Sequence, residues 1–388
     1  MKIVDIRERT VSLGTAARNA AIGFAEMTAS AVVIVTDAQR GGRPLCGLGF
    51  DSAGRYGHGG LMRERFIPRL MAASPDAYAA QHEESIDPLR AWEVMMLGEK
   101  PGGHGDRAGA VGLLDAALWD LAAKTSGVPL WRMLADRFND GRVQPRVPVY
   151  ASGGHYREAD DIERLAAELA AARAHGYRRF KIKIGGAPLD ADRHRIERAL
   201  GAVGDGSALA ADGNGALDRG RAFAYAEMLG SYELAWFEEP VEPLDYAALA
   251  ELAKACRIPI ATGENLFSAA DARNLIRHGG LRPGRDLLQF DVSLSYGIPE
   301  YLRIIETIET AGWARCRLMP HAGHLLAFHA AAGLCLGGHE VATDETSVFT
   351  AMAAGMRLED GCTVASDAPG LGLETAPALA ALFAGMLP

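Results

Sequence analysis

Hydrophobic residues follow two different spacings in the first third of the chain. In the first 50 residues they gather in three short runs, "MKIVDIRERTV", "TASAVVIVTD" and "LCGLGF", and glycine and proline separate the last two. Such runs between turn signals are typical of antiparallel strands. From about Glu64 to Leu134 apolar residues recur every three or four positions, with a break at the Gly-Val-Pro near residue 128, which predicts helices. The first part of the chain is therefore expected to be an α+β unit.

The pattern changes again after residue 142, where short β-rich runs alternate with amphipathic helices. Seven runs begin at intervals of roughly 25 to 30 residues, the length of a βα unit in a parallel barrel. They are "VPVYAS", "RFKIKIG", "ALAAD", "LAWFEE", "IPIATGE", "LLQFDV" and "RCRLMPH". An eighth strand is expected near "GGHEVAT", and one of the helices is expected to begin at Ser268 and end at Gly279.

A doubly wound sheet is the alternative architecture. No G-x-G-x-x-G turn follows the first strand of a βαβ unit, so the barrel is favoured. We predict an α/β fold with a modified (β/α) TIM-type barrel over 143–345, preceded by the α+β unit over 1–142. The segment 346–388, whose first part has strand and turn character, is expected to pack back on that first unit.

Composition narrows the choice of partner. The 388 residues carry a formal net charge of −9 and contain no block rich in lysine or arginine, which argues against nucleic acid or an anionic membrane and favours a small molecule. The five cysteines are scattered without a C-x-x-C pair, so neither disulfides nor a zinc site is indicated. "MKIVDIRERT" carries charges where a signal peptide needs an apolar run, and we expect a cytoplasmic protein.

The second to the seventh predicted barrel strands each end in, or are followed directly by, an ionisable residue. In order along the chain these residues are Lys181 and Lys183, Asp212, Glu238, Glu264, Asp291 and, just after the seventh run, His321. The carboxyl ends of barrel strands meet at one mouth, so these side chains should converge there. Three converging carboxylates repel one another unless a hard divalent cation binds them, and Mg²⁺ is the expected cofactor.

Each of these features also has an ordinary structural interpretation. The lysines could form the solvent face of an edge strand, the acidic residues could be solvated strand ends, and His321 could be a loop histidine. Taken one at a time, the acidic motifs and the histidine are more often structural. Their joint placement at six consecutive strand ends favours a catalytic site.

Lys181 and Lys183 share one face of their strand, because alternate residues of a strand point the same way. Two adjacent ammonium groups beside a divalent cation, partly desolvated, should lower each other's pKa, so that one becomes a neutral amine. Such an amine could remove a proton next to a carboxylate. Across the mouth, Asp291 could orient His321 as an acid or base on the opposite face of the substrate.

These motifs resemble the enolase superfamily in its mandelate racemase subgroup, and the resemblance spans essentially the whole chain. "KIKIGG" corresponds to a base, Lys183, with Lys181 beside it. "ADGNG", "WFEEP" and "ATGENLFS" correspond to magnesium ligands at Asp212, Glu238 and Glu264. "FDVSLSYG" and "MPHAGH" correspond to an Asp291 and His321 dyad. The resemblance implies a capping domain at 1–142, a catalytic barrel, and a homo-oligomer.

Further segments resemble the D-tartrate dehydratases of this superfamily, among them "RNAAIGF", "SAGRYGHGGL", "EKPGGHG" and "ATGENLFSAADARNL". In that resemblance the capping loops close over the substrate, which makes Asn19, Arg55, Tyr56 and Lys100 candidate substrate contacts. Glu340 resembles a glutamate that hydrogen-bonds an enediolate intermediate. The implied reaction is magnesium-dependent loss of water from an acid sugar, D-tartrate giving oxaloacetate. Another acid-sugar dehydratase, a hydroxy-acid racemase or epimerase, and a non-catalytic scaffold are the alternatives.

Overall fold

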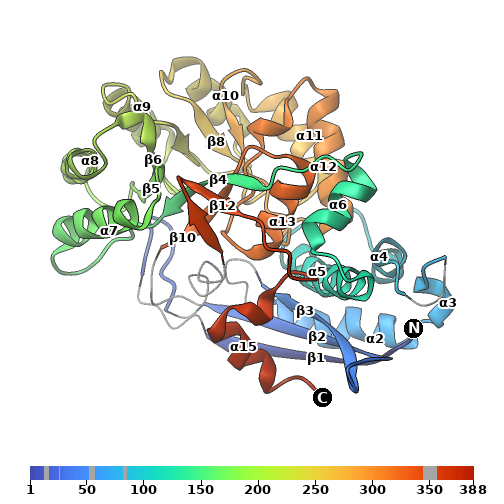
Figure 1. The fold of residues 1–388 in the computed structure, drawn as a ribbon. Coiled ribbons are helices and arrows are strands. Elements are labelled where there is room, and N and C mark those ends of the chain that lie inside the picture. Colours follow the sequence, from blue (N-terminus) through green and yellow to red (C-terminus); the bar gives the residue numbers. More distant parts are fainter. Residues whose placement is uncertain (13–16, 26, 52–56, 82–84, 344–355) are drawn as a thin grey trace.

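A three-stranded antiparallel sheet opens the chain, as predicted (Figure 1). The computed structural model describes residues 1–12, 17–25, 27–51, 57–81, 85–343 and 356–388. The strands lie in the order β1 (Ile3–Ser12), β2 (Thr28–Arg40) and β3 (Arg43–Phe50). Helical segments follow, namely α1 (His58–Leu61), a π-helical turn (Met62–Phe66), α2 (Ile67–Ala72), α3 (Pro75–Tyr78), α4 (Pro88–Met96), α5 (Asp106–Ser126) and α6 (Leu130–Phe138).

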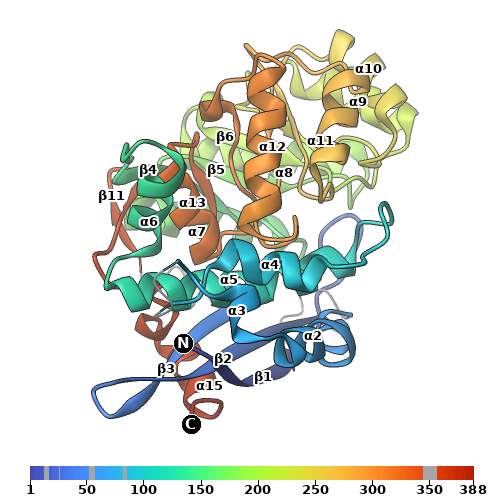
Figure 2. The same ribbon diagram turned by 90° about the vertical axis from the view of Figure 1, so that its right-hand side faces the viewer.

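Helix α5 connects this sheet to the rest of the molecule. It lies between the sheet and the barrel (Figure 2), and almost all of its side chains are buried. Glycines permit its close approach to both neighbours: a Cβ at Gly47 of β3 would lie 2.1 Å from the carbonyl oxygen of Ala117, and one at Gly112 would lie 1.7 Å from that of Ser293. Since Ser293 follows the predicted site residue Asp291, α5 helps to fix that part of the barrel.

A parallel barrel forms the larger part of the fold, as predicted. Its consecutive strands pair in chain order: β4 (Arg146–Ser152), β5 (Phe180–Lys183), β6 (Leu209–Asp212), β7 (Phe237–Glu238), β8 (Ile260–Thr262) and β9 (Leu287–Leu288). The helices between and after them are α7 (Asp161–His175), α8 (Leu189–Val203), α9 (Arg219–Leu229), α10 (Tyr246–Ala255), α11 (Ala269–His278), α12 (Ile298–Thr310) and α13 (Leu325–Leu334). Ser268 caps α11 and Gly279 ends it, both as predicted.

At the place of the seventh barrel strand the chain forms only a single parallel bridge. The predicted strand "RCRLMPH" is wrong: Arg315–Arg317 form a 3₁₀ turn, and only Leu318 makes a parallel bridge, to Leu288 of β9. Pro320, which has no N–H group, then prevents the ladder from continuing. The N–H of Gly337 donates to the carbonyl of Leu318 at 2.9 Å. The predicted eighth strand is present as β10 (His339–Ala342), which pairs with β4 and completes the ring.

The C-terminal segment contacts both parts of the molecule. The hairpin β11 (Arg357–Glu359) and β12 (Cys362–Val364) pairs antiparallel with β4, so the prediction that this stretch packs on the first unit is wrong for the hairpin. Residues 346–355 lie outside the described residues. Helix α15 (Pro377–Ala384), preceded by a 3₁₀ turn at Leu373–Thr375, lies beside β1 (Figure 1), where Arg7 Nη1 donates to the carbonyl of Met386 at 2.7 Å.

Within the described residues, no helix combines the length and the apolar character needed to cross a membrane.

Candidate active site

Strand register brings the predicted residues together. Lys183 of β5 lies opposite Asp212 of β6, which lies opposite Glu238 of β7. All three side chains are buried at the carboxyl ends of their strands, and Lys181, two residues before Lys183, is fully buried on the same face. Parallel pairing without a shift thus places two ammonium groups beside the carboxylates.

The carboxylates of Asp212, Glu238 and Glu264 form one cluster. Each offers an oxygen that lies within 4.8 Å of the oxygens of the other two. Oε2 of Glu264 is buried and makes no hydrogen bond within the part of the chain that the structure describes. Two buried carboxylates and the half-buried Glu264, which has one oxygen without a hydrogen bond, match the hard oxygen ligands that Mg²⁺ prefers. The residues present therefore fit a divalent cation.

The lysines act as counter-charges to this cluster. Lys183 Nζ lies 2.6 Å from Asp212 Oδ2, and Lys181 Nζ pairs with Glu238 and, at 3.0 Å, with Oε1 of Glu340. Burial by itself lowers the pKa of each lysine, but the surrounding carboxylates outweigh both burial and the neighbouring ammonium group, so both pKa values are raised. The sequence predicted the opposite direction, a lowered lysine pKa, for a site in which a divalent cation is bound to the carboxylates.

Glu238 is held by two side chains that the sequence argument missed. Trp236 Nε1 and Gln289 Nε2 each donate to its Oε2 at 2.8 Å. Burial raises the pKa of Glu238 to about 8, in spite of the adjacent Lys181. Strand alternation could have found both residues, since Trp236 lies two positions before Glu238 and Gln289 two positions before Asp291, each on the face of the neighbouring site residue.

The structure separates the two glutamates of "WFEEP". Glu238 joins the carboxylate cluster, as expected for the first glutamate of the pair. Glu239 has a left-handed backbone conformation, with φ of 38°, and receives the Nδ2 group of Asn265 at 3.0 and 3.1 Å on its two oxygens. Burial raises the pKa of Glu239 well above its ordinary value.

His321 lies at the far end of the cluster from Lys183. Its Nδ1 is 3.0 Å from Asp291 Oδ2, and its Nε2 faces Glu264 at 3.5 Å and Glu340 at 3.9 Å. Although burial opposes the imidazolium form, Glu264 and Asp291 raise the pKa of His321 to about 9. His321 is therefore a protonated acid near neutral pH, directed at the carboxylates.

Glu340 lies on β10, where the sequence argument expected the eighth strand. Its Oε1 pairs with Lys181, and its Oε2 accepts the N–H of Ala322, which follows His321, at 3.0 Å. Lys181 and His321 hold the pKa of Glu340 below its ordinary value, although burial opposes this. Glu340 thus joins the lysine side of the site to the histidine loop.

The four candidate substrate contacts lie outside the carboxylate cluster or outside the described residues. Asn19 is buried in the turn before β2, where its Oδ1 accepts the N–H groups of Ala21 and Ile22, both at 2.8 Å. Lys100 is exposed in the loop between α4 and α5. Arg55 and Tyr56 lie outside the described residues.

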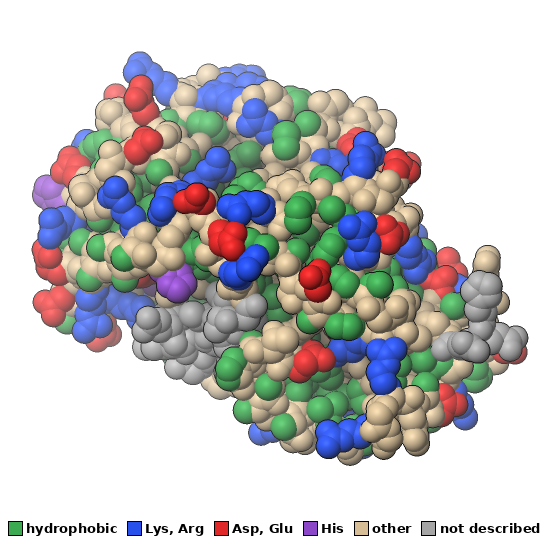
Figure 3. Space-filling model, viewed as in Figure 1, with side chains coloured by type: hydrophobic (Ala, Val, Ile, Leu, Met, Phe, Trp, Pro, Cys, Tyr) green, Lys and Arg blue, Asp and Glu red, His purple; other side chains and the backbone are tan. Residues whose placement is uncertain are grey.

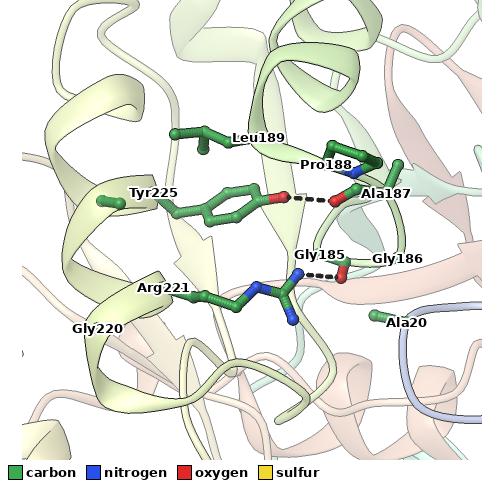
Figure 4. A pocket seen from close by; sticks show the side chains of 10 residues that line it. Ala20, Gly185, Gly186, Ala187, Pro188, Leu189, Gly220, Arg221 and Tyr225 are labelled. Carbon is green, nitrogen blue, oxygen red and sulfur yellow. Dashed lines mark hydrogen bonds between the residues drawn. The ribbon is translucent and has the colours of Figure 1, made fainter.

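An open cavity of about 660 Å³ lies beside the site, next to the turn that follows Lys183 (Figure 4). Arg221 and Tyr225 of α9 form one wall. Arg221 donates to the carbonyl of Gly185, and the hydroxyl oxygen of Tyr225 lies 3.2 Å from the carbonyl oxygen of Ala187. None of the clustered carboxylates lines it. The cavity therefore shows how α9 supports this turn rather than where the chemistry occurs.

A buried carboxylate supports the same turn from below. Asp192 of α8 accepts the N–H of Gly185 at 2.7 Å and the hydroxyls of Tyr156 and Tyr225 at 2.7 and 2.6 Å. Burial raises the pKa of Asp192 in spite of these hydrogen bonds. The N–H of Tyr156 donates to the carbonyl of Arg18 at 2.9 Å, so the network reaches the turn that carries Asn19.

Comparison with known proteins agrees with this geometry. Residues 164–379 match the family model described as "Enolase C-terminal domain-like", which is more than half of the chain. The chain belongs to this family. It is 29% identical over 333 residues to the 3,6-anhydro-alpha-L-galactonate cycloisomerase of Streptomyces coelicolor, a match that covers 84% of each protein.

Two further similarities are informative about chemistry and fold. The chain is 28% identical over 297 residues to the L-talarate/galactarate dehydratase of Salmonella typhimurium, covering 76% of this chain and 68% of that protein. The structure of a Streptomyces coelicolor racemase with bound magnesium superimposes with a TM-score of 0.77 at 25% identity, covering 95% of this chain and 96% of the other. The enolase-like fold predicted from the motifs is confirmed.

Proposed function

We propose that this protein is a magnesium-dependent hydro-lyase that removes water from an acid sugar, with D-tartrate, giving oxaloacetate, as the proposed substrate. One observation carries the proposal: a lysine and a protonated histidine flank one cluster of three carboxylates, with Lys183 beside Asp212 and His321 beside Glu264. A base at one end and an acid at the other fit the loss of a proton and a hydroxyl from adjacent carbons. A dehydratase and a magnesium-containing structure among the similar proteins support it.

Asp212, Glu238 and Glu264 would hold the magnesium ion. When bound, the ion would balance their charge, release Lys183 from its pairing with Asp212, and stabilise negative charge on the substrate carboxylate. Without the ion, the pairing with Asp212 raises the pKa of Lys183 and keeps it protonated. Release from this pairing would lower that pKa towards the neutral amine that a base must be to accept a proton.

The chain's own residues then divide the reaction between two faces. Lys183 accepts the proton from the carbon next to the carboxylate, and the C–H electron pair forms an enediolate. Lys181 donates a hydrogen bond to one of its oxygens, and Glu340 donates to another when its carboxyl group carries a proton. His321, held by Asp291, donates its Nε2 proton to the β-hydroxyl, which leaves as water, and the resulting enol tautomerises to a 2-keto acid.

D-tartrate is the proposed substrate because the segments carrying Asn19 and Lys100 resemble those of D-tartrate dehydratases. The amide of Asn19 and the ammonium of Lys100, together with Arg55 and Tyr56, are the proposed contacts to its hydroxyl and carboxylate groups. The formal net charge of −9 and the mixture of both charge signs over the face in Figure 3 support a small-molecule partner rather than nucleic acid. We also propose that the protein is cytoplasmic and forms a homo-oligomer. Light scattering of the purified protein would test the oligomeric state.

The test is a keto-acid release assay with Mg²⁺ against D-, L- and meso-tartrate, galactarate and a panel of C4 to C6 aldonic and aldaric acids. Release from D-tartrate that disappears in Lys183→Ala supports the proposal. Release from another acid of the panel would change the proposed substrate and still support the dehydratase reaction. Absence of release from every acid refutes the dehydratase function.

An epimerase is the second candidate, because Lys183 and His321 also form a two-face pair that could remove and return a proton. A racemase is among the similar structures. Epimerisation predicts exchange of the α-hydrogen in deuterium oxide, with inversion and without keto acid. The same samples, analysed by proton NMR, distinguish the two reactions.

A further inference from the structure

A second histidine, His324, lies three residues after His321 at the N-cap of α13. Its Nδ1 accepts the N–H of Ala327 at 3.1 Å. A ring nitrogen that accepts a hydrogen bond carries no proton, so the proton of the neutral ring lies on Nε2. The helix cap therefore fixes the tautomer of His324.

The protonated nitrogen of His324 is directed at the aspartate of the proposed dyad. Nε2 lies 3.5 Å from Asp291 Oδ1, and both side chains are buried. The two oxygens of Asp291 have different partners. Oδ1 also accepts the N–H of Leu294 at 2.8 Å, and Oδ2 faces His321 Nδ1 at 3.0 Å. In spite of burial, the two histidines hold the pKa of Asp291 far below its ordinary value.

We infer that His324 is a positioning residue for the proposed acid His321, acting through Asp291. The hydrogen bond from His324 Nε2 orients the Asp291 carboxylate, so that Oδ2 receives His321 Nδ1–H and His321 Nε2 stays directed at the substrate. The inference deepens the proposed function and rests on it, since it takes His321 as the group that protonates the leaving hydroxyl. In this role His324 acts through Asp291 and is not one of the residues proposed to hold the cation.

The alternative is that His324 only caps α13. Two substitutions separate the roles. His324→Asn keeps a short side-chain acceptor for the N–H of Ala327, which asparagine provides well at an N-cap, but does not reach Asp291. His324→Gln has a longer side chain whose amide N–H₂ can reach Asp291, but it is a poor N-cap.

The experiment measures keto-acid release, α-hydrogen exchange in deuterium oxide and the unfolding temperature for the wild type and both variants, with Mg²⁺ and the preferred acid. For His324→Asn we expect release to fall about 10- to 100-fold, a part of what general acid catalysis supplies, with KM and the unfolding temperature unchanged. Exchange, which depends on Lys183, should persist, so the ratio of exchange to release rises. His324→Gln should release keto acid within a few-fold of wild type and unfold at a lower temperature.

A substrate analogue with fluoride in place of the β-hydroxyl adds a second readout, because fluoride leaves with less help from an acid. We expect His324→Asn to process this analogue within a few-fold of wild type. Wild-type release in His324→Asn, or equal losses of release and exchange, would overturn the inference and leave the proposed function standing. Absence of release from wild type itself would instead overturn the proposed function, and the assigned role of His324 with it.

Discussion

His329, in the middle of α13, predicts how the protein responds to acid. It is buried, its Nδ1 accepts the N–H of Trp131 at 2.9 Å, and its Nε2–H donates to the carbonyl of Leu371 at 3.2 Å. The ring thus joins α13 to α6 and to the C-terminal segment in its neutral form. Burial lowers the pKa of His329 from 6.5 to about 4, and the hydrogen bond to the carbonyl of Leu371 opposes this only in part.

The sign and size of the effect follow from this shift. The unfolded chain takes up a proton at His329 as the pH falls through 6.5, whereas the folded chain does so only near 4. The stability is therefore fully present above pH 6.5 and is lost between 6.5 and 4. At pH 5 the difference in proton binding corresponds to about 2 kcal/mol, and the full shift corresponds to about 3 kcal/mol.

Urea denaturation of wild type and His329→Gln at pH 7.5 and pH 5 tests this value. Glutamine can donate to the carbonyl of Leu371 but does not titrate, so its own cost is the same at both pH values. Between them the free energy of unfolding should fall about 2 kcal/mol more for wild type than for the variant. His339, whose pKa burial lowers to about 3, contributes equally to both proteins and cancels. Equal losses would refute the reasoning, because His329 would then bind protons alike in both states.

Two further predictions concern the buried charges. In Lys181→Met, Glu238 and Glu340 lose a shared counter-charge, which should cost about 3 kcal/mol and lower the unfolding temperature without Mg²⁺ by about 4 °C for a chain of 388 residues. Calorimetry should show that saturating Mg²⁺ raises this temperature more in the variant than in wild type, and equal increments would contradict the reasoning. Tyr225→Phe removes a hydroxyl that donates to buried Asp192, so the urea midpoint should fall by the equivalent of about 2 kcal/mol, whereas an unchanged midpoint would show that Asp192 finds another partner.

The sequence predicted the barrel and its mouth because spacing and alternation are local properties. Strand ends 26 residues apart (238 − 212 and 264 − 238) become neighbours once the strands pair in parallel, and the register of Asp212 with Glu238 follows directly. The length of each strand depends on long-range pairing, so it could not be predicted from the sequence. The stretch before His321 is apolar enough for a strand, yet Pro320 reduces it to one bridge.

The contacts between side chains could not be predicted from the sequence either. Alternation shows that Lys181 lies on the site face, but its contact with Glu340 depends on β10 closing the ring beside β4. The role of His324 depends on where α13 begins, because only the N-cap position fixes its tautomer. Both contacts join segments more than 30 residues apart, Lys181 with Glu340 and Asp291 with His324, and only the folded chain brings these together.

The direction of the lysine pKa shifts shows how the site is balanced. Asp212, Glu238 and Glu340 are buried beside the half-buried Glu264, and charges of one sign cannot be buried together without compensation. Lys181 and Lys183 supply that compensation, and their raised pKa values are its consequence. A divalent cation on the same carboxylates would compete with the ammonium groups for the same oxygens. Binding the cation and freeing the base are then two parts of one charge exchange, which is why the Mg²⁺ response of Lys181→Met bears on the mechanism as well as on stability.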